Sequence, residues 1–160
     1  MMPPTSNRPV DWEELVTQNE NRLYRTALAI LGCQQEAEDA VQDAFLKYLE
    51  KAPEFDSGEH ERAWLLRVTV NGCKSRLRSP WRRRAPLLEQ YPAADPEERA
   101  LLEAVFALPP RDRAVVHLYY YEGYKTPEIA AITGQTEGTV RSRLSRARAR
   151  LRELLKGEEV

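Results

Sequence analysis

The sequence predicts an all-α protein of two small helical domains joined by a proline-rich, basic linker, with a helix-turn-helix in the second domain. Apolar residues recur every three or four positions along most of the chain, which is the spacing of amphipathic helices, and no pair of alternating strand segments occurs. This pattern stops at residues 80–96, where four prolines occur. We therefore expect a first domain at residues 10–79, a linker at 80–96 and a second domain at 97–157.

The first domain is predicted to contain three helices. Residues 11–31 and 35–52 each carry apolar side chains at helical spacing, and Gly32 is a stop signal after the first of them. The stretch PEFDSGEH then interrupts the pattern with a proline and a glycine. A third helix is expected over residues 61–79, because its apolar spacing is helical although its β-branched run lowers the helix propensity.

The second domain is predicted to begin with two short amphipathic helices at residues 97–108 and 111–122. A helix-turn-helix follows them. Thr126 marks the start of its first helix, and Gly134 suits the left-handed turn after it. In such motifs the second helix lies in the DNA major groove, with its N-terminal residues at the base edges.

The second helix of this motif, capped by Thr136, has three kinds of face at about 100° per residue. The apolar face is formed by Val140, Leu144, Ala147 and Leu151. The two flanks carry arginines, with Arg141, Arg148 and Arg152 on one side and Arg143, Arg146 and Arg150 on the other. The face opposite the apolar one is small, with Ser142, Ser145 and Ala149. Small residues between two arginine rows let a helix enter a groove while the arginines reach both phosphate walls, which favours DNA binding over a merely solvated basic helix.

Charge is segregated along the chain, although the formal net charge is only −1. Acidic residues predominate from residue 36 to 61, whereas residues 62–84 contain many basic and no acidic residues. Acidic residues return at 95–103, and the last helix is basic again. Such segregation produces fields of opposite sign on different faces. The basic faces are suited to nucleic acid, and the acidic helix at 35–52 is suited to a protein partner or to solvent.

Several classes of protein are excluded by the sequence. No apolar run approaches the ~20 residues of a bilayer span, and the first residues do not resemble a secretory signal. Cys33 and Cys73 lie far apart in the sequence and are expected to be reduced thiols, so we expect a cytoplasmic protein without direct membrane insertion. No metal-ligand spacing, nucleophile motif or phosphate-binding glycine loop occurs. We therefore expect no metal, no cofactor, no small-molecule substrate and no enzymatic activity.

The stretch LPPRDRAVVHLYYYEGYKTPEIAAITGQTEGTVRSRLSRARARLRELL resembles the C-terminal domain of bacterial sigma factors of the extracytoplasmic-function (ECF) group. Its GTVxSRLxRARxxL pattern, at residues 138–151, is highly specific to that group. The stretch AEDAVQDAFLKYLEK is similar to the part of the family that docks on the clamp helices of RNA polymerase. The stretch AWLLRVTVNGCKSRLR is similar to the part that melts and reads the minus-10 promoter element. The resemblance covers about residues 12–156 and implies a non-enzymatic subunit that directs polymerase to promoters.

The resemblance implies three sets of site residues. Polymerase would bind Asp39, Gln42, Asp43, Phe45 and Lys47. The minus-10 element would bind Phe55, Ser57, His60, Arg67, Asn71, Lys74 and Arg78. The minus-35 element would bind Thr136, Glu137, Thr139, Arg141, Ser142, Arg143, Ser145, Arg146 and Arg148. The implied partners are core RNA polymerase, promoter DNA and an anti-sigma protein.

One alternative stays open at this point, a free-standing transcriptional regulator that binds DNA through the same helix-turn-helix and does not bind core polymerase. The first domain offers no alternating strands for the phosphoacceptor or ligand domain of such a regulator. Two further expectations concern packing. Trp64 and the tyrosines at 119–121 are expected to pack mainly in the core. The acidic first domain could also cover the basic last helix when the chain is free.

Overall fold

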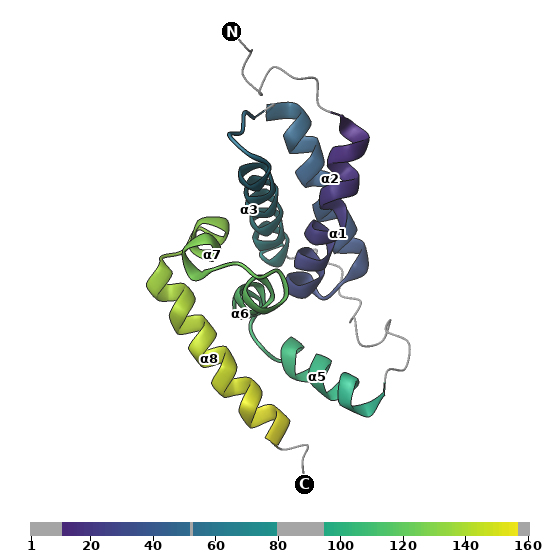
Figure 1. Cartoon of the computed structure of the whole chain (residues 1–160). Helices are drawn as coiled ribbons and strands as arrows, with labels where there is room; N and C mark the ends of the chain where they lie inside the picture. Colours follow the sequence, from purple (N-terminus) through teal and green to yellow (C-terminus); the bar gives the residue numbers. More distant parts are fainter. Residues whose placement is uncertain (1–10, 52, 80–94, 157–160) are drawn as a thin grey trace.

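The computed structural model describes residues 11–51, 53–79 and 95–156, and every regular element within these ranges is a helix (Figure 1). The first helical unit contains α1 (Trp12–Leu31), α2 (Gln34–Lys51) and α3 (Gly58–Leu77). The second contains α5 (Pro96–Phe106), α6 (Pro110–Val116), the π-helix η2 (His117–Tyr121), α7 (Thr126–Thr133) and α8 (Glu137–Lys156). The predicted all-α fold class is confirmed. Of the predicted linker, residues 80–94 lie outside the described residues.

The ends of the helices in the first unit follow from local side-chain bonds. The backbone of Gly32 is left-handed, with φ 66°, and its N–H donates to the Leu28 carbonyl, so the predicted end of α1 is confirmed. The start of α3 differs from the prediction. The Ser57 hydroxyl accepts from the His60 N–H over 3.1 Å and caps the helix, which therefore begins at Gly58 rather than at residue 61.

The core of the first unit lies between its three helices, which pack on one another. Leu23 of α1 and Leu65 and Leu66 of α3 are almost fully buried. Ala37 and Ala44 of α2 are also fully buried, and their small size lets the backbone of α2 approach its neighbours. Trp64 is partly buried against this core. The expected packing role of its side chain is confirmed.

The second unit departs from regular helix at η2. The Glu122 N–H donates to the His117 carbonyl over 3.1 Å, a bond that spans five residues rather than four. This wider turn changes which side chains face inward. Tyr119 is half-buried, whereas Tyr120 and Tyr121 are 57% and 69% exposed. The expectation that all three tyrosines pack mainly in the core is therefore wrong for the last two.

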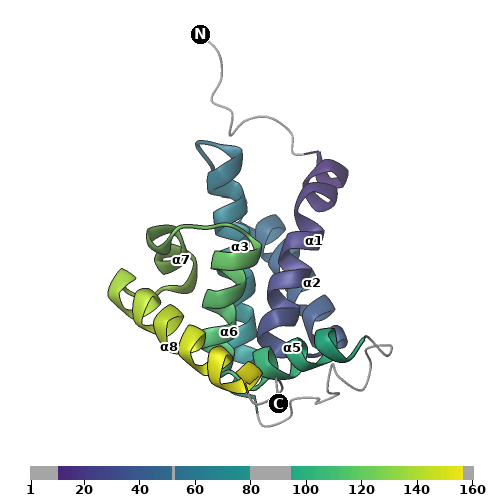
Figure 2. The same ribbon diagram turned by 60° about the horizontal axis from the view of Figure 1, so that its bottom comes forward.

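The two helical units pack against each other, α1 on α6 and η2, and α3 on α7. Their buried apolar side chains form one continuous cluster. Helix α8 lies along the outer side of the second unit, and its main contacts are with α5, α6 and α7 (Figures 1 and 2). The expectation that the acidic first domain covers α8 is therefore wrong. Partly buried arginines of α8 find partners within their own unit instead.

Candidate nucleic-acid interface

The first helix of the helix-turn-helix, α7, begins at Thr126. Its start is fixed by Glu128, whose carboxylate accepts from the Lys125 N–H over 2.9 Å. The hydroxyl of Thr126 donates to the Glu137 carboxylate over 3.1 Å and so joins the starts of α7 and α8. Thr126 is the first helical residue and does not cap the helix, a difference of one position from the prediction.

The turn between the two helices is formed as predicted. Gly134 is left-handed, with φ 71°, and its N–H donates to the Ala130 carbonyl. The Thr136 hydroxyl accepts from the Thr139 N–H over 3.2 Å and caps α8. Thr136 is exposed, and Thr139 is half-buried. These bonds fix the angle at which α8 leaves the turn.

The faces of α8 match the predicted helical wheel. Its apolar face packs into the second unit, with Val140, Leu144 and Ala147 at 2% exposure or less. The opposite face is open to solvent, and its exposed residues include Ser142, Ser145, Arg146 and Ala149. The Arg141 side chain is 66% exposed and lies 3.6 Å from Glu137, one turn earlier. This outer face can approach DNA without any rearrangement of its own unit.

Two of the arginines predicted to contact the minus-35 element are held by partners in their own unit. Arg143 donates to Asp112 of α6 over 2.8 Å, and both side chains are largely buried. Arg148 donates to the Tyr120 hydroxyl, and its guanidinium lies 5.5 Å from the ring centroids of both Tyr119 and Tyr120. In this structure both guanidinium groups hold α8 on its own unit. The exposed arginines of the helix, such as Arg141 and Arg146, are the ones available on its outer face.

The predicted minus-10 residues fall into two places in the first unit. Phe55, Ser57 and His60 lie in the loop before α3 and in its first turn. Ser57 and His60 are exposed, whereas Phe55 is partly buried. The His60 ring meets the Phe55 ring edge-on at 5.1 Å. The loop is therefore held by internal contacts while its polar groups face solvent.

A cluster of aromatic rings packs between this loop and the core of the first unit. Tyr48 of α2 stacks on Phe55 at 6.0 Å and meets Trp64 edge-on at 5.9 Å. The Tyr48 hydroxyl donates to Glu61 over 2.9 Å. Burial, together with this bond to Glu61, raises the pKa of Tyr48 to about 12. The phenol therefore stays protonated and remains a hydrogen-bond donor at neutral pH.

The remaining minus-10 residues lie along α3 and its end. Arg67, Asn71 and Arg78 are exposed, and their spacing of four and seven residues places them on one side of the helix axis. Lys74 is only half exposed, and its ammonium group donates to the Thr133 carbonyl at the end of α7. Burial, together with the nearby Arg111, Arg143 and Arg78, lowers the pKa of Lys74. In this structure the ammonium group of Lys74 therefore contacts the second unit.

The predicted polymerase-binding residues lie on α2. Asp39, Gln42, Asp43 and Lys47 are exposed, and Asp43 forms an ion pair with Arg76 of α3 at 2.6 Å. Phe45 lies on the other side of the helix, where it is 7% exposed and packs edge-on against Trp12. It therefore supports this surface from the core.

Two leucines on α2 are exposed, and neither was predicted as a docking residue, since Leu49 is one of the apolar side chains at helical spacing in residues 35–52. Leu46 and Leu49 are 60% and 58% exposed and follow Gln42 and Asp43 along the same side of the helix. The helical wheel contains this signal, because an apolar residue at position 46 falls beside the polar residues Gln42 and Asp43 rather than on the buried face. The polymerase-binding surface predicted from the sequence thus gains an apolar part. Apolar area of this kind is what gives a protein-docking surface much of its affinity.

In the described ranges, no group of three or more histidine, cysteine, aspartate or glutamate side chains is arranged to hold a metal ion. None of the helices that the structure describes is long and apolar enough to cross a membrane.

Comparison with known families gives two matches that divide the chain as its helical units do. Residues 15–83 match the family model of sigma-70 region 2, and residues 98–151 match that of sigma-70, region 4. Region 2 thus falls on the first unit, which contains α1, α2 and α3, and region 4 falls on the second unit, which contains the helix-turn-helix. The class of protein that the fold and these two matches define is the sigma-70 family.

Similar proteins of known class assign the chain to one group within this family. The ECF RNA polymerase sigma factor SigM of Mycobacterium tuberculosis is 36% identical over 150 residues, which are 90% of this chain and 76% of that protein. The ECF RNA polymerase sigma factor SigE of Mycolicibacterium smegmatis is 35% identical over 158 residues, and the match covers 61% of its length. The chain belongs to the ECF group of RNA polymerase sigma factors.

Solved structures show the same arrangement of helices. The sigma factor RpoE of Bartonella quintana, in complex with the anti-sigma factor NepR, has a TM-score of 0.73 and 29% identity, covering 91% of this chain and 97% of that one. CnrH, in complex with the cytosolic domain of CnrY, has a TM-score of 0.68 and 27% identity, covering 92% of this chain and 88% of that one.

Proposed function

We propose that this protein is a dissociable promoter-recognition subunit of bacterial RNA polymerase. It carries out no reaction itself and requires no cofactor or small-molecule substrate. The observation that carries the proposal is that one chain has two kinds of exposed surface. Helix α8 of the helix-turn-helix presents serine and arginine side chains, and α2 of the region 2 unit presents a face that is partly apolar, with Leu46 and Leu49. A free-standing regulator needs the first of these surfaces and not the second.

In this proposal the residues divide by element. Helix α8 reads the minus-35 element through its first turns and its outer face, with Thr136, Arg141, Ser142, Ser145 and Arg146 as the accessible contacts. Helix α3 and the loop before it bind the minus-10 strand through Ser57, His60, Arg67, Asn71 and Arg78. Helix α2 docks on core polymerase through Asp39, Gln42, Asp43 and Lys47, together with Leu46 and Leu49.

The domains of the proposal are region 2 at 10–79, the linker at 80–96 and region 4 at 97–157. The regulator is proposed to be an anti-sigma protein, as it is for RpoE with NepR. We place the protein in the cytoplasm, where core polymerase is found. Charge-assisted contacts from arginine to phosphate supply much of the DNA affinity, and the base edges in the major groove supply specificity.

Co-elution of the purified chain with core RNA polymerase on a sizing column tests this function. We expect stable, roughly equimolar co-elution for the wild-type chain. The charge-reversed variant Asp43→Arg should elute separately from polymerase, whereas Glu20→Arg, at an exposed position of α1, should still co-elute. No co-elution of the wild-type chain, combined with tight DNA binding by the chain alone, would replace this proposal with the free-standing regulator.

A further inference from the structure

Glu137 is the first residue of α8, at the end from which the second helix of such a motif reaches the base edges. Its side chain is 42% exposed, and its Oε1 atom has two neighbours. The Thr126 hydroxyl, from the start of α7, donates to this atom over 3.1 Å, and Nη1 of Arg141 lies 3.6 Å from it. The carboxylate is therefore held in place while a large part of the side chain stays open to solvent.

A carboxylate at the leading end of a DNA-binding helix is unexpected from charge alone, because DNA phosphates repel it. The Arg141 guanidinium reduces this repulsion, since it lies one turn further along on the same side of α8. Within the described part of the chain, both contacts of the Glu137 carboxylate end on Oε1. Its Oε2 atom can therefore accept a hydrogen bond from a group outside the chain.

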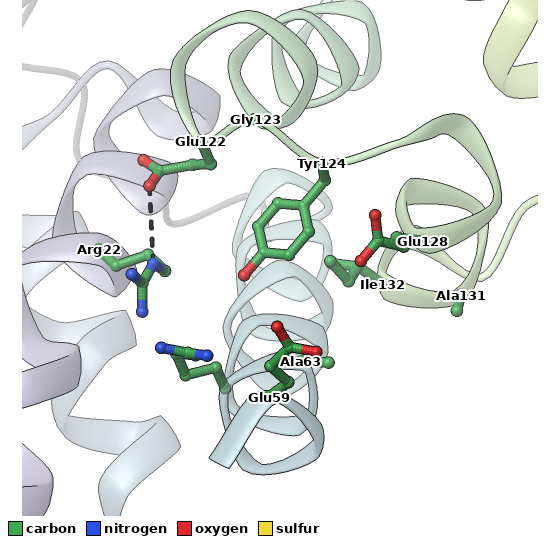
Figure 3. A pocket seen from close by; sticks show the side chains of 10 residues that line it. Arg22, Glu59, Ala63, Glu122, Gly123, Tyr124, Glu128, Ala131 and Ile132 are labelled. Carbon is green, nitrogen blue, oxygen red and sulfur yellow. Dashed lines mark ion pairs between the residues drawn. The ribbon is translucent and has the colours of Figure 1, made fainter. Parts of the chain in front are cut away.

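The other carboxylate at a helix start of this motif has a different environment. Glu128 accepts from the Lys125 N–H over 2.9 Å. It also lines a cavity of about 430 Å³, together with Glu59 and Ala63 of α3 (Figure 3). Its side of α7 is thus turned toward the first unit and away from the outer face of α8. Of these two carboxylates, Glu137 is the one that a base can reach in the groove occupied by α8.

Gly138 gives an independent sign that another molecule comes close to this end of α8. It is not among the described glycines with a left-handed backbone, so its conformation does not require glycine. Apart from its chain neighbours and the backbone of its own helix, no described atom lies within 4 Å of the position that a Cβ would occupy. Alanine would therefore fit and would favour the helix more than glycine does. Close approach of a ligand to the backbone explains a glycine that neither conformation nor packing requires.

The chemistry of base edges indicates what this end of the helix can recognise. In the major groove a G·C pair presents two adjacent acceptors, guanine N7 and O6, and then a donor, the cytosine N4 amino group. Arginine donates to the two acceptors, and a carboxylate accepts from the amino group. An A·T pair has its amino group between two acceptors instead. Arg141 and Glu137, which lie 3.6 Å apart, offer donors and an acceptor side by side and are complementary to a G·C pair.

We propose that Glu137 reads a cytosine of the minus-35 element by accepting a hydrogen bond from its N4 amino group, while Arg141 donates to the guanine paired with that cytosine. Thr126 is a positioning residue, because it holds the carboxylate and acts on the base only through it. Gly138 lets the start of α8 come close to the floor of the groove. The inference deepens the proposed function and rests on it, since it gives the helix-turn-helix a base preference that positive charge alone does not supply.

Selection from a library of duplex DNA tests this assignment. The full chain, assembled with core polymerase, is equilibrated with DNA whose promoter segment is randomised, and the bound DNA is sequenced. The same selection is carried out with the full chain alone. For the wild-type chain we expect one position of the upstream element at which cytosine is bound about tenfold more tightly than adenine.

Glu137→Gln is the decisive variant, because an amide has nearly the same shape as the carboxylate but also donates. Glutamine pairs with N6 and N7 of adenine, so the preference at that one position should change from cytosine to adenine. Thr126→Val, which removes the donor hydroxyl, should reduce the cytosine preference at the same position. Glu128→Gln makes the same change at the carboxylate that lines the cavity, and it should leave every base preference unchanged.

Gly138→Ala separates stability from binding. The variant chain should resist urea at least as well as the wild-type chain, because a methyl group fits in open space and alanine favours the helix. Its affinity for the selected DNA should nevertheless fall several-fold, since the methyl group would lie between the helix backbone and the bases. A variant that binds this DNA as tightly as the wild type would contradict the close approach that the proposal requires.

The selections also distinguish the possible failures. An unchanged base profile in Glu137→Gln would overturn the proposal, as would an equal loss of preference at every position, which a purely structural role of the carboxylate predicts. A wild-type chain that does not assemble with polymerase would instead reject the proposed function, while selection with the chain alone would still show whether Glu137 reads cytosine. A wild-type chain that selects no sequence in either form would overturn both.

Discussion

Arg143 of α8 donates to Asp112 of α6 over 2.8 Å, and its side chain is 18% exposed while that of Asp112 is 10% exposed. The pair connects the helix proposed to read the minus-35 element to the helix beneath it. An arginine at this position of a basic helix therefore has a structural partner, although the sequence groups it with the DNA-binding arginines. The consequence is a difference in stability between substitutions at neighbouring arginines.

Arg143→Ala should lower the free energy of unfolding by about 2 kcal/mol, because it leaves the Asp112 carboxylate largely buried without its cation. The exposed Arg146 offers the matched control, and Arg146→Ala should change stability by less than about 0.5 kcal/mol. Urea unfolding followed by circular dichroism measures both values. Equal stability of the two variants would show that the Arg143–Asp112 pair contributes nothing to the fold.

Arg141→Ala should weaken binding to minus-35 DNA while leaving stability nearly unchanged, because its side chain is 66% exposed and its single ion pair is a surface one. Loss of one phosphate or base contact should also reduce the slope of log affinity against log salt by about 1. Fluorescence anisotropy with labelled DNA at several salt concentrations measures both quantities. Arg99→Ala, on α5, is the control of equal charge. An unchanged affinity and salt slope would remove Arg141 from the DNA interface.

Leu46→Asp should weaken association with core polymerase, because it replaces a side chain that is 60% exposed on the proposed docking face of α2 with a charge. The fold should be unaffected, since Leu46 packs little within the chain. Leu101→Asp is the matched control, at a leucine of α5 that is 49% exposed. Surface plasmon resonance with immobilised core polymerase measures the two affinities. If both variants lose affinity equally, the leucine on α2 has no particular role in docking.

The all-α fold and the turn geometry could be predicted from the sequence because they depend on local signals. Gly32 ends α1 as expected, Gly134 adopts the left-handed backbone expected of it, and Val140 and Leu144 are buried as the wheel of α8 requires. Local reasoning was less successful at Ser57, where a side-chain cap lets α3 begin at a glycine that the sequence suggests is a breaker.

The contacts between the units could not be predicted in the same way. The partners Arg25 and Glu122 are 97 residues apart in the sequence, and nothing local distinguishes them from exposed charges. Opposite charges alone favoured an acidic face over α8, but desolvation makes a few well-placed partners more important than net charge. The π-turn at η2, which exposes Tyr120 and Tyr121, likewise has no signal in the apolar spacing.

The His117 side chain should make the stability of the protein fall as the solution becomes acidic. Burial lowers the pKa of His117 below its ordinary value of about 6.5, and the nearby Glu122 opposes this shift only in part. The other groups that face the ring are Arg25 of α1, which lowers the pKa further, and Tyr121, which stacks on it at 5.2 Å. The folded chain therefore binds the His117 proton less readily than the unfolded chain does.

The sign of the effect follows from proton linkage. Between the lowered folded pKa and about 6.5, the unfolded chain holds more protons, so the free energy of unfolding decreases as the pH falls through this interval and is independent of His117 above it. Urea unfolding of the wild-type chain and of His117→Gln at several values from about pH 8 to about pH 5 measures the difference. The wild-type chain should lose more stability than the variant below about pH 6.5. Parallel curves for the two proteins would show that the buried imidazole does not titrate differently on folding.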